Sequence, residues 1–188
     1  MSSRYTITEW VHQIAGLFIR EGDLCIDATA GKGKDTLFLC EQVGENGQVL
    51  AFDIQQEGIE ATQSLLDRYG MGSRAKVILR GHENMAEYAA EGTVSVILFN
   101  LGYLPGGDHS KSTCSDTTLK AAKQGLSLLK SGGLMGICIY SGGDSGFEEK
   151  EAVLSWAVNL PVGEYDVIQT PFCNKPNNPP LPLFIRKR

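Results

Sequence analysis

The residues able to carry chemistry in this sequence fall at the ends of short apolar runs. Asp27 closes the first run, Asp53 closes the second, and Asn100 closes the fourth. Their carboxylate and amide oxygens can accept hydrogen bonds from hydroxyls, amino groups or backbone amides. In an open α/β sheet, ligands bind outside the carboxyl ends of the strands. These residues therefore predict one ligand site along one edge of a sheet.

A glycine-rich segment, DATAGKG over residues 27–33, follows the first run. Gly31 and Gly33 would let the backbone approach a ligand closely, although a lone Gly-x-Gly is equally typical of a tight turn. A dinucleotide-binding Gly-x-Gly-x-x-Gly would need glycine where Thr36 stands, and the Walker sequence is absent. An NAD-linked oxidoreductase is therefore the weaker interpretation of this loop.

The next two runs end in residues suited to a nucleoside. Asp53, followed by Gln55, can accept hydrogen bonds from both ribose hydroxyls, or it can cap the next helix. Gly81 and His82 follow the third run, where the imidazole can contact a base or cap a helix start.

The fourth run ends in Asn100, Leu101, Gly102 and Tyr103. This spacing resembles the Asp/Asn-Pro-Pro-Tyr/Phe motif of amino-group methyltransferases, with Leu101 and Gly102 in place of the prolines. That motif implies an amide oxygen that accepts hydrogen bonds from the target nitrogen and an aromatic ring that packs on its base. A turn residue leaving the sheet is the structural alternative for Asn100.

The elements that must position these residues alternate along the chain. A Thr6–Glu9 capping box opens the first helical pattern, and apolar runs then alternate with 3.6-residue periodicity. We predict helices over 7–18, 36–43, 55–70, 83–92, 117–133 and 148–160, and strands over 24–29, 48–54, 75–80, 93–100, 134–140, 164–172 and 182–188.

This order predicts right-handed β-α-β units and a final hairpin, because the last two strands have no helix between them. The expected fold is α/β: a Rossmann-like three-layer sandwich with a mostly parallel seven-stranded sheet and a C-terminal antiparallel hairpin. Residues 1–188 are expected to form a single domain, which suits their number.

Composition narrows the choice of partner and compartment. The chain carries 17 basic and 22 acidic residues, so its net charge of −5 excludes a generally basic nucleic-acid coat. Five cysteines without a C-x-x-C pair predict neither a disulfide framework nor a metal site, and they fit a reducing cytoplasm. No apolar run approaches the length of a membrane span, so we expect a cytoplasmic protein without membrane contact.

Five strings together carry a resemblance to one family: DATAGKGKDT, FDIQ, GHEN, NLGYLPGGDHS and NKPNNPP. They resemble the MnmM-type tRNA methyltransferases, small bacterial proteins long labelled rRNA methylases, from the first helix to the final hairpin. The resemblance implies S-adenosylmethionine as methyl donor, the tRNA anticodon loop as partner, and a homodimer. It also implies an acceptor, the aminomethyl group of 5-aminomethyl-2-thiouridine at the wobble position.

The resemblance also assigns the site residues by position. It implies Asn100 and Tyr103 at the acceptor. An alkylamine must lose a proton before it attacks the methyl group, and His109 or Asp108 is the candidate base for that step. The residues implied for the cofactor are Asp27, Thr29, Gly31, Gly33, Asp53, Gln55, Gly81 and His82. Open alternatives are methylation of rRNA or a small amine, and a non-catalytic RNA-binding module. A covalent route through Cys114 is disfavoured because the sequence shows no activating neighbour.

Overall fold

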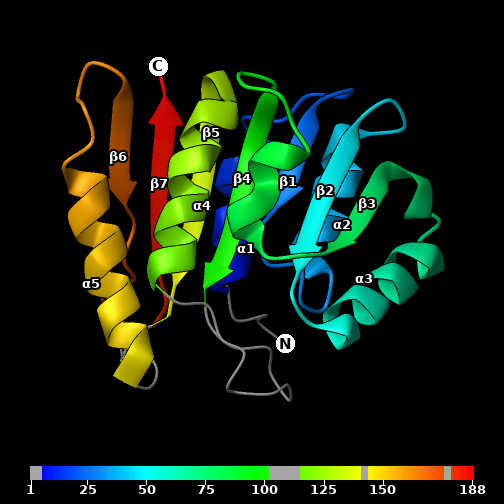
Figure 1. The fold of residues 1–188 in the computed structure, drawn as a ribbon, viewed down its shortest axis with the longest axis horizontal. Coiled ribbons are helices and arrows are strands. Elements are labelled where there is room, and N and C mark those ends of the chain that lie inside the picture. The colour runs from blue at the N-terminus through cyan, green and yellow to red at the C-terminus, as the bar shows by residue number, and fades with distance from the viewer. Residues whose placement is uncertain (1–5, 102–114, 141–143, 176–178) are drawn as a thin grey trace.

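The computed structural model describes residues 6–101, 115–140, 144–175 and 179–188. A seven-stranded sheet of order β3-β2-β1-β4-β5-β7-β6 forms its middle layer (Figure 1). The strands are β1 Leu24–Asp27, β2 Gln48–Asp53, β3 Ala75–Leu79, β4 Val94–Leu101, β5 Leu129–Ile139, β6 Tyr165–Gln169 and β7 Leu181–Lys187. The predicted three-layer fold is confirmed.

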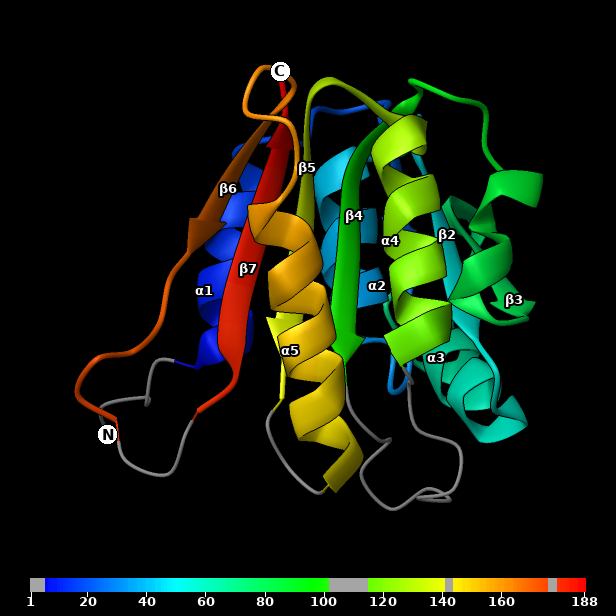
Figure 2. The same cartoon turned by 60° about the vertical axis from the view of Figure 1, so that its left-hand side comes forward.

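Helices cover both faces of this sheet (Figures 1 and 2). One face is covered by α1 Ile7–Gly16, α2 Lys34–Val43 and α3 Gln56–Arg68, and the other by α4 Ser115–Leu128 and α5 Asp144–Val158. Two 3₁₀ turns, η1 Gly72–Arg74 and η2 His82–Glu87, flank β3. Within the described ranges, no helix is both long and apolar enough to cross a bilayer.

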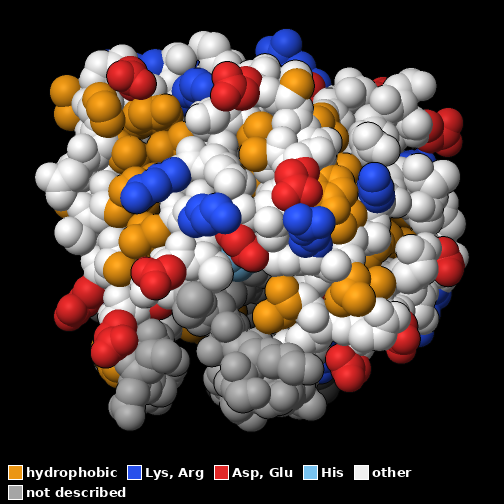
Figure 3. Space-filling view, viewed as in Figure 1, with side chains coloured by type: hydrophobic (Ala, Val, Ile, Leu, Met, Phe, Trp, Pro, Cys, Tyr) orange, Lys and Arg blue, Asp and Glu red, His pale blue; other side chains and the backbone are white. Residues whose placement is uncertain are grey.

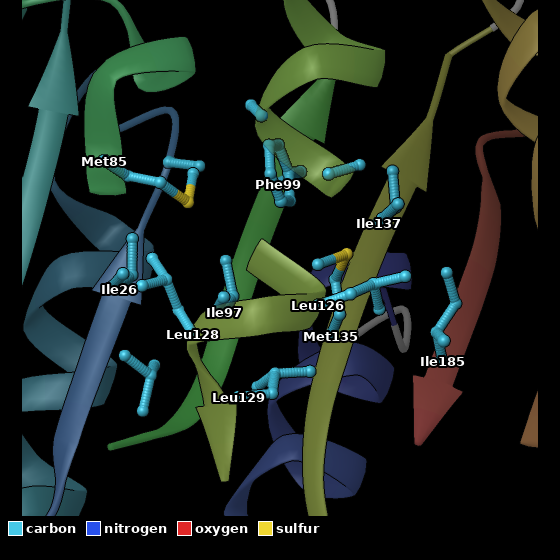
Figure 4. Close-up of a cluster of buried hydrophobic side chains, with 14 of the residues drawn as sticks. Ile26, Met85, Ile97, Phe99, Leu126, Leu128, Leu129, Met135, Ile137 and Ile185 are labelled. Atoms are coloured by element: carbon cyan, nitrogen blue, oxygen red, sulfur yellow. The ribbon is translucent and has the colours of Figure 1, made fainter. Parts of the chain in front are cut away.

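The central strands are buried on both faces. Residues 94–99 of β4 are all buried, which is typical of a parallel strand covered by helices on either side. Ile97 and Phe99 point toward α4 and η2, while Val96 and Leu98 pack on the α1–α2 side. Figure 4 shows the first of these two core clusters, in which Met85 of η2 also lies.

The predicted start of the first helix is confirmed by its capping box. The Thr6 hydroxyl accepts a hydrogen bond from the Glu9 amide at 3.2 Å, and the Glu9 carboxylate accepts from the Thr6 amide at 2.6 Å. The helix ends at Gly16, two residues before the predicted end at residue 18. The segment predicted as a helix over 83–92 is the shorter 3₁₀ turn η2.

The predicted helix over 117–133 was wrong at its carboxyl end. The helix α4 stops at Leu128, and β5 begins at the next residue, where Leu129 pairs with Val94. The register then shifts, so that Leu134 pairs with Val96. Gly132 lies in this irregular stretch with a φ of 79°, a conformation that ends helical periodicity and favours glycine.

The predicted terminal hairpin is confirmed, with one addition. Strand β7 pairs antiparallel with β6 and also antiparallel with β5, so it lies between them. Consequently β6 runs in the same direction as β5, and its carboxyl end lies with those of β1, β2 and β4. We call this side of the molecule the carboxyl edge.

Candidate functional site

Asp27 ends β1 at the carboxyl edge and is fully buried. One of its oxygens accepts a hydrogen bond from the Thr29 amide at 3.1 Å, and the other accepts from the Thr36 hydroxyl at 2.6 Å. Burial raises the pKa of Asp27 to about 7, and the nearby Asp35 charge acts in the same direction. The Asp27 side chain therefore fixes the conformation of the glycine-rich loop.

Thr29 joins this loop to the end of β4. Its hydroxyl oxygen accepts a hydrogen bond from the backbone N–H of Asn100 at 2.7 Å, although the two residues are 71 positions apart in the sequence. Because the Thr29 amide is itself held by Asp27, one chain of hydrogen bonds runs from β1 through the loop to Asn100. Thr29 thus couples two parts of the predicted site.

Both loop glycines contact α3, and close packing requires glycine at Gly33. Gly33 has a φ of 77°, and a Cβ there would lie 2.9 Å from the Cα of Thr62. The Thr62 hydroxyl donates to the Gly31 carbonyl oxygen at 3.4 Å. A side chain at Gly33 would push the loop away from α3, which explains the spacing of the predicted motif.

Asp53 ends β2, and its carboxylate contacts the glycine-rich loop directly. One carboxylate oxygen accepts from the Gly31 amide and the other from the Gln55 amide, each at 2.8 Å. The N-cap residue of α3 is Gln55, so Asp53 does not occupy the cap position. A carboxylate offers about four acceptor sites. Each oxygen of Asp53 therefore keeps capacity for a ligand hydroxyl.

Gly58, on the first turn of α3, makes room for that carboxylate. A Cβ at Gly58 would lie 2.6 Å from Oδ2 of Asp53. Sequence reasoning missed this residue and also Thr36, whose hydroxyl holds Asp27. The only signal for Gly58 was a glycine inside a helical pattern, which is unfavourable unless packing requires it.

His82 presents a buried acceptor at the start of η2. Its Nδ1 lies 3.0 Å from the Ala28 carbonyl oxygen, which can only accept, so Nδ1 carries the hydrogen. Burial lowers the pKa of His82, which favours the neutral ring. Nε2 is then an acceptor, and it has no partner among the residues that the structure describes. Such a buried atom is suited to an N–H or O–H of a ligand.

Of the residues predicted at the acceptor, only Asn100 lies within the described part of the chain. Asn100 is half-buried near the end of β4 and pairs with Cys138 of β5. Tyr103 and His109 lie outside the described residues, as do Asp108 and Cys114. The structure brings the predicted cofactor residues of the first three strands together with Asn100.

Sequence reasoning also missed a buried pair between the two helices that follow β4 and β5. The Thr118 hydroxyl of α4 donates to the Glu149 carboxylate of α5 at 2.6 Å, and both side chains are buried. No cluster of metal-binding side chains occurs within the described ranges.

The donor and acceptor set fits an adenosine-containing cofactor. Asp53 offers carboxylate oxygens for ribose hydroxyls, His82 offers the unpartnered Nε2, and the glycine loop offers backbone without Cβ atoms. S-adenosylmethionine would thus be held by residues of β1, β2 and η2. Thr36 occupies the position where a dinucleotide-binding loop has its third glycine, and its buried hydroxyl is committed to Asp27.

Comparisons with known proteins agree with this geometry. The model of the family described as "Putative rRNA methylase" matches residues 49–186. A chloroplastic tRNA (mnm(5)s(2)U34)-methyltransferase of Arabidopsis thaliana is 40% identical over 98% of this chain and 70% of that protein.

Solved structures extend the likeness over the whole fold. A putative rRNA-methylase from Clostridium thermocellum superposes with a TM-score of 0.95 at 41% identity, covering 99% of this chain and 100% of that one. A putative methyltransferase from Streptococcus mutans, in complex with SAH, gives 0.89 at 32% identity over 99% and 100%.

The sheet order and the polar carboxyl edge define a Rossmann-like, S-adenosylmethionine-dependent methyltransferase. Within that class, the chain belongs to the family described as "Putative rRNA methylase".

Proposed function

We propose that this methyltransferase transfers the methyl group of S-adenosylmethionine to the aminomethyl group of 5-aminomethyl-2-thiouridine at the tRNA wobble position. The name of the Arabidopsis relative, which aligns over 98% of this chain, supports tRNA as the substrate and the modified uridine at position 34 as the target nucleoside. The observation that best supports methyl transfer at this site is the hydrogen bond between the Thr29 hydroxyl and the backbone N–H of Asn100. It fixes the cofactor loop against the strand end that carries the proposed acceptor residue.

The proposed cofactor roles follow the contacts at each strand end. Asp53 accepts the ribose hydroxyls, with the Gln55 amide holding its carboxylate, and His82 accepts a hydrogen bond from the adenine amino group. The backbones of Gly31, Gly33 and Gly81 would lie along the cofactor, although the Cβ position of Gly33 is filled by Thr62 and that of Gly81 by Glu83. Asp27 and Thr29 act as positioning residues, because their side chains are used within the loop.

The proposed acceptor roles fall on Asn100, Tyr103 and His109. When bound, S-adenosylmethionine supplies an electrophilic methyl group, so the protein has to align the amine with it and exclude water. Asn100 can accept an N–H of the neutral amine, and its uncharged side chain does not favour the ammonium form. Tyr103 would pack on the modified base, and His109 or Asp108 would take the proton that the amine must lose.

A second candidate function is methylation of ribosomal RNA, which the description of the matching family model favours. The two RNA substrates present different nucleosides to the same edge. Fold alone does not choose between them, since one fold supports many substrates.

A labelling experiment distinguishes these functions. The protein is incubated with methyl-labelled S-adenosylmethionine and RNA from cells that lack the enzyme, and nucleosides from tRNA and rRNA are separated and identified by mass spectrometry. We expect label only in 5-methylaminomethyl-2-thiouridine from tRNA. Label confined to rRNA would overturn the tRNA assignment, and label in neither fraction would favour a small amine.

We also propose a single-domain homodimer in a reducing cytoplasm. Three free cysteines, Cys25, Cys40 and Cys138, are buried in the core, which suits a compartment where thiols stay reduced. Light scattering coupled to size exclusion tests the oligomeric state, with a mass near twice that of one chain as the expected result.

A further inference from the structure

Two exposed lysines stand on the glycine-rich loop at the carboxyl edge. Lys32 lies between Gly31 and Gly33, and Lys34 is the first residue of α2. Neither forms an ion pair within the part of the chain that the structure describes. The neighbouring Asp35 instead contacts Nε2 of His12 at 2.7 Å. These two ammonium groups are therefore available to an anionic partner.

A third exposed lysine is held in place after β6. Thr170 accepts a hydrogen bond from Nε1 of Trp10 at 2.9 Å, which ties the end of β6 to α1. Phe172 packs against the core cluster beneath α1 and α2. The Lys175 ammonium lies 3.9 Å from the centre of the Phe172 ring, a cation–π contact that restrains it.

The helix α1 connects these two groups of lysines. It packs on β5 and β7 and against α2 (Figure 2). Its His12 contacts Asp35 of α2, and its Trp10 contacts Thr170 at the end of β6. Four strand spacings separate β1 from β6 in the sheet, a span of about 19 Å. Lys32, Lys34 and Lys175 therefore border one stretch of the carboxyl edge, several nucleotides long.

Four acidic side chains near this stretch have contacts of their own. Asp27 is buried, Asp35 contacts His12, Glu9 accepts hydrogen bonds from Thr6, and Asp53 accepts from the Gly31 and Gln55 backbone amides. On the face covered by α4 and α5, by contrast, basic and acidic side chains lie interspersed (Figure 3). An anion approaching the α1 side of the edge therefore meets lysines beside carboxylates that already have partners, although the whole chain is acidic.

We propose that Lys32, Lys34 and Lys175 contact phosphates of the RNA strand that flanks the target nucleotide. This inference rests on the proposed function, because it needs RNA as the substrate. The lysines supply affinity and orientation without reading sequence, as phosphate contacts do. The nucleotide to be methylated would then be presented to the end of β4.

The test measures binding of a fluorescent anticodon stem–loop RNA by anisotropy over a series of salt concentrations. Each phosphate contact to single-stranded RNA contributes about 0.7 to the slope of log affinity against log salt, or about five-fold in affinity over one decade of salt. The variant K32Q/K34Q should lose about 1.4 of slope, and adding K175Q should bring the loss to about 2. Lys123→Gln, an exposed lysine on α4, is the matched control and should keep the wild-type slope.

Two further measurements separate this inference from its alternatives. Phe172→Leu keeps every charge but removes the ring beneath Lys175, so it should weaken RNA binding in the same direction as K175Q, by less. Calorimetry with SAH should give the wild-type affinity for K32Q/K34Q. A wild-type salt slope in the triple variant would overturn the proposal, as would loss of SAH affinity at an unchanged slope. A wild-type protein that does not bind the RNA at all would overturn the proposed function as well.

Discussion

Replacing Asp27 by asparagine should make the stability of the fold less sensitive to pH. The fold raises the pKa of this carboxyl from 3.8 to about 7, so the folded chain favours its protonated form. The unfolded chain loses that proton near the ordinary value, so the contribution of Asp27 to the stability of the wild type falls as pH rises from about 4 to about 7. The asparagine side chain carries no charge, so this loss disappears in the variant.

The structure indicates that the exchange keeps both hydrogen bonds. The asparagine oxygen can accept from the Thr29 amide, and its amide nitrogen can donate to the Thr36 hydroxyl, which accepts as well as donates. The main difference between Asp27→Asn and the wild type is then the buried charge, which costs free energy in the wild type at neutral pH.

The pKa difference sets the size of the effect. From about pH 6 to pH 8, Asp27→Asn should gain about 1.4 kcal/mol of unfolding free energy relative to the wild type. Urea denaturation of both proteins across this range, above the pI of about 5.2, measures the difference. Other titrating groups, His82 among them, cancel because both proteins contain them. Asp67→Asn, at an exposed carboxyl on α3, is the control for the same chemical change. A difference that does not vary with pH would refute the reasoning.

Substitutions at three further positions test individual contacts of the site. Gly58→Ala places a Cβ 2.6 Å from the Asp53 carboxylate and should weaken SAH binding in calorimetry by about ten-fold, or about 1.4 kcal/mol; unchanged affinity would contradict the packing argument. Thr29→Val leaves the Asn100 amide without its acceptor, at a cost of about 1–3 kcal/mol, and should lower the rate of methyl transfer more than SAH affinity. Thr29→Ser keeps the hydroxyl and should restore the rate; failure to do so would point to lost packing instead. His82→Leu removes the Nε2 acceptor and should weaken SAH binding by about ten-fold, whereas equal affinity would show that Nε2 does not contact the cofactor.

The features predictable from the sequence were those with a local cause. The capping box at Thr6 and the apolar run of β4 each depend on neighbouring residues, and the structure confirms them. The positions of Asp27, Asp53 and Asn100 at strand ends follow directly from those runs. Alternation of strands and helices was enough to predict the sheet and its terminal hairpin.

The features that escaped prediction depend on contacts between distant segments. Thr36 entered only as the absence of a glycine, yet its hydroxyl holds Asp27. The glycine at position 58 is needed because α3 packs on Asp53 of a different element. The end of α4 was missed because Leu128 and Leu129 continue the helical pattern, while pairing with Val94 makes Leu129 the start of a strand.

The most direct test of the account is the division of roles between Asp53 and Asn100. SAH binding by calorimetry and methyl transfer to tRNA are measured for Asp53→Ala and Asn100→Ala in parallel with the wild type. We predict that Asp53→Ala weakens SAH binding, while Asn100→Ala abolishes methyl transfer and keeps SAH affinity. Equal loss of SAH affinity in both variants would contradict the separation of cofactor and acceptor residues along the carboxyl edge.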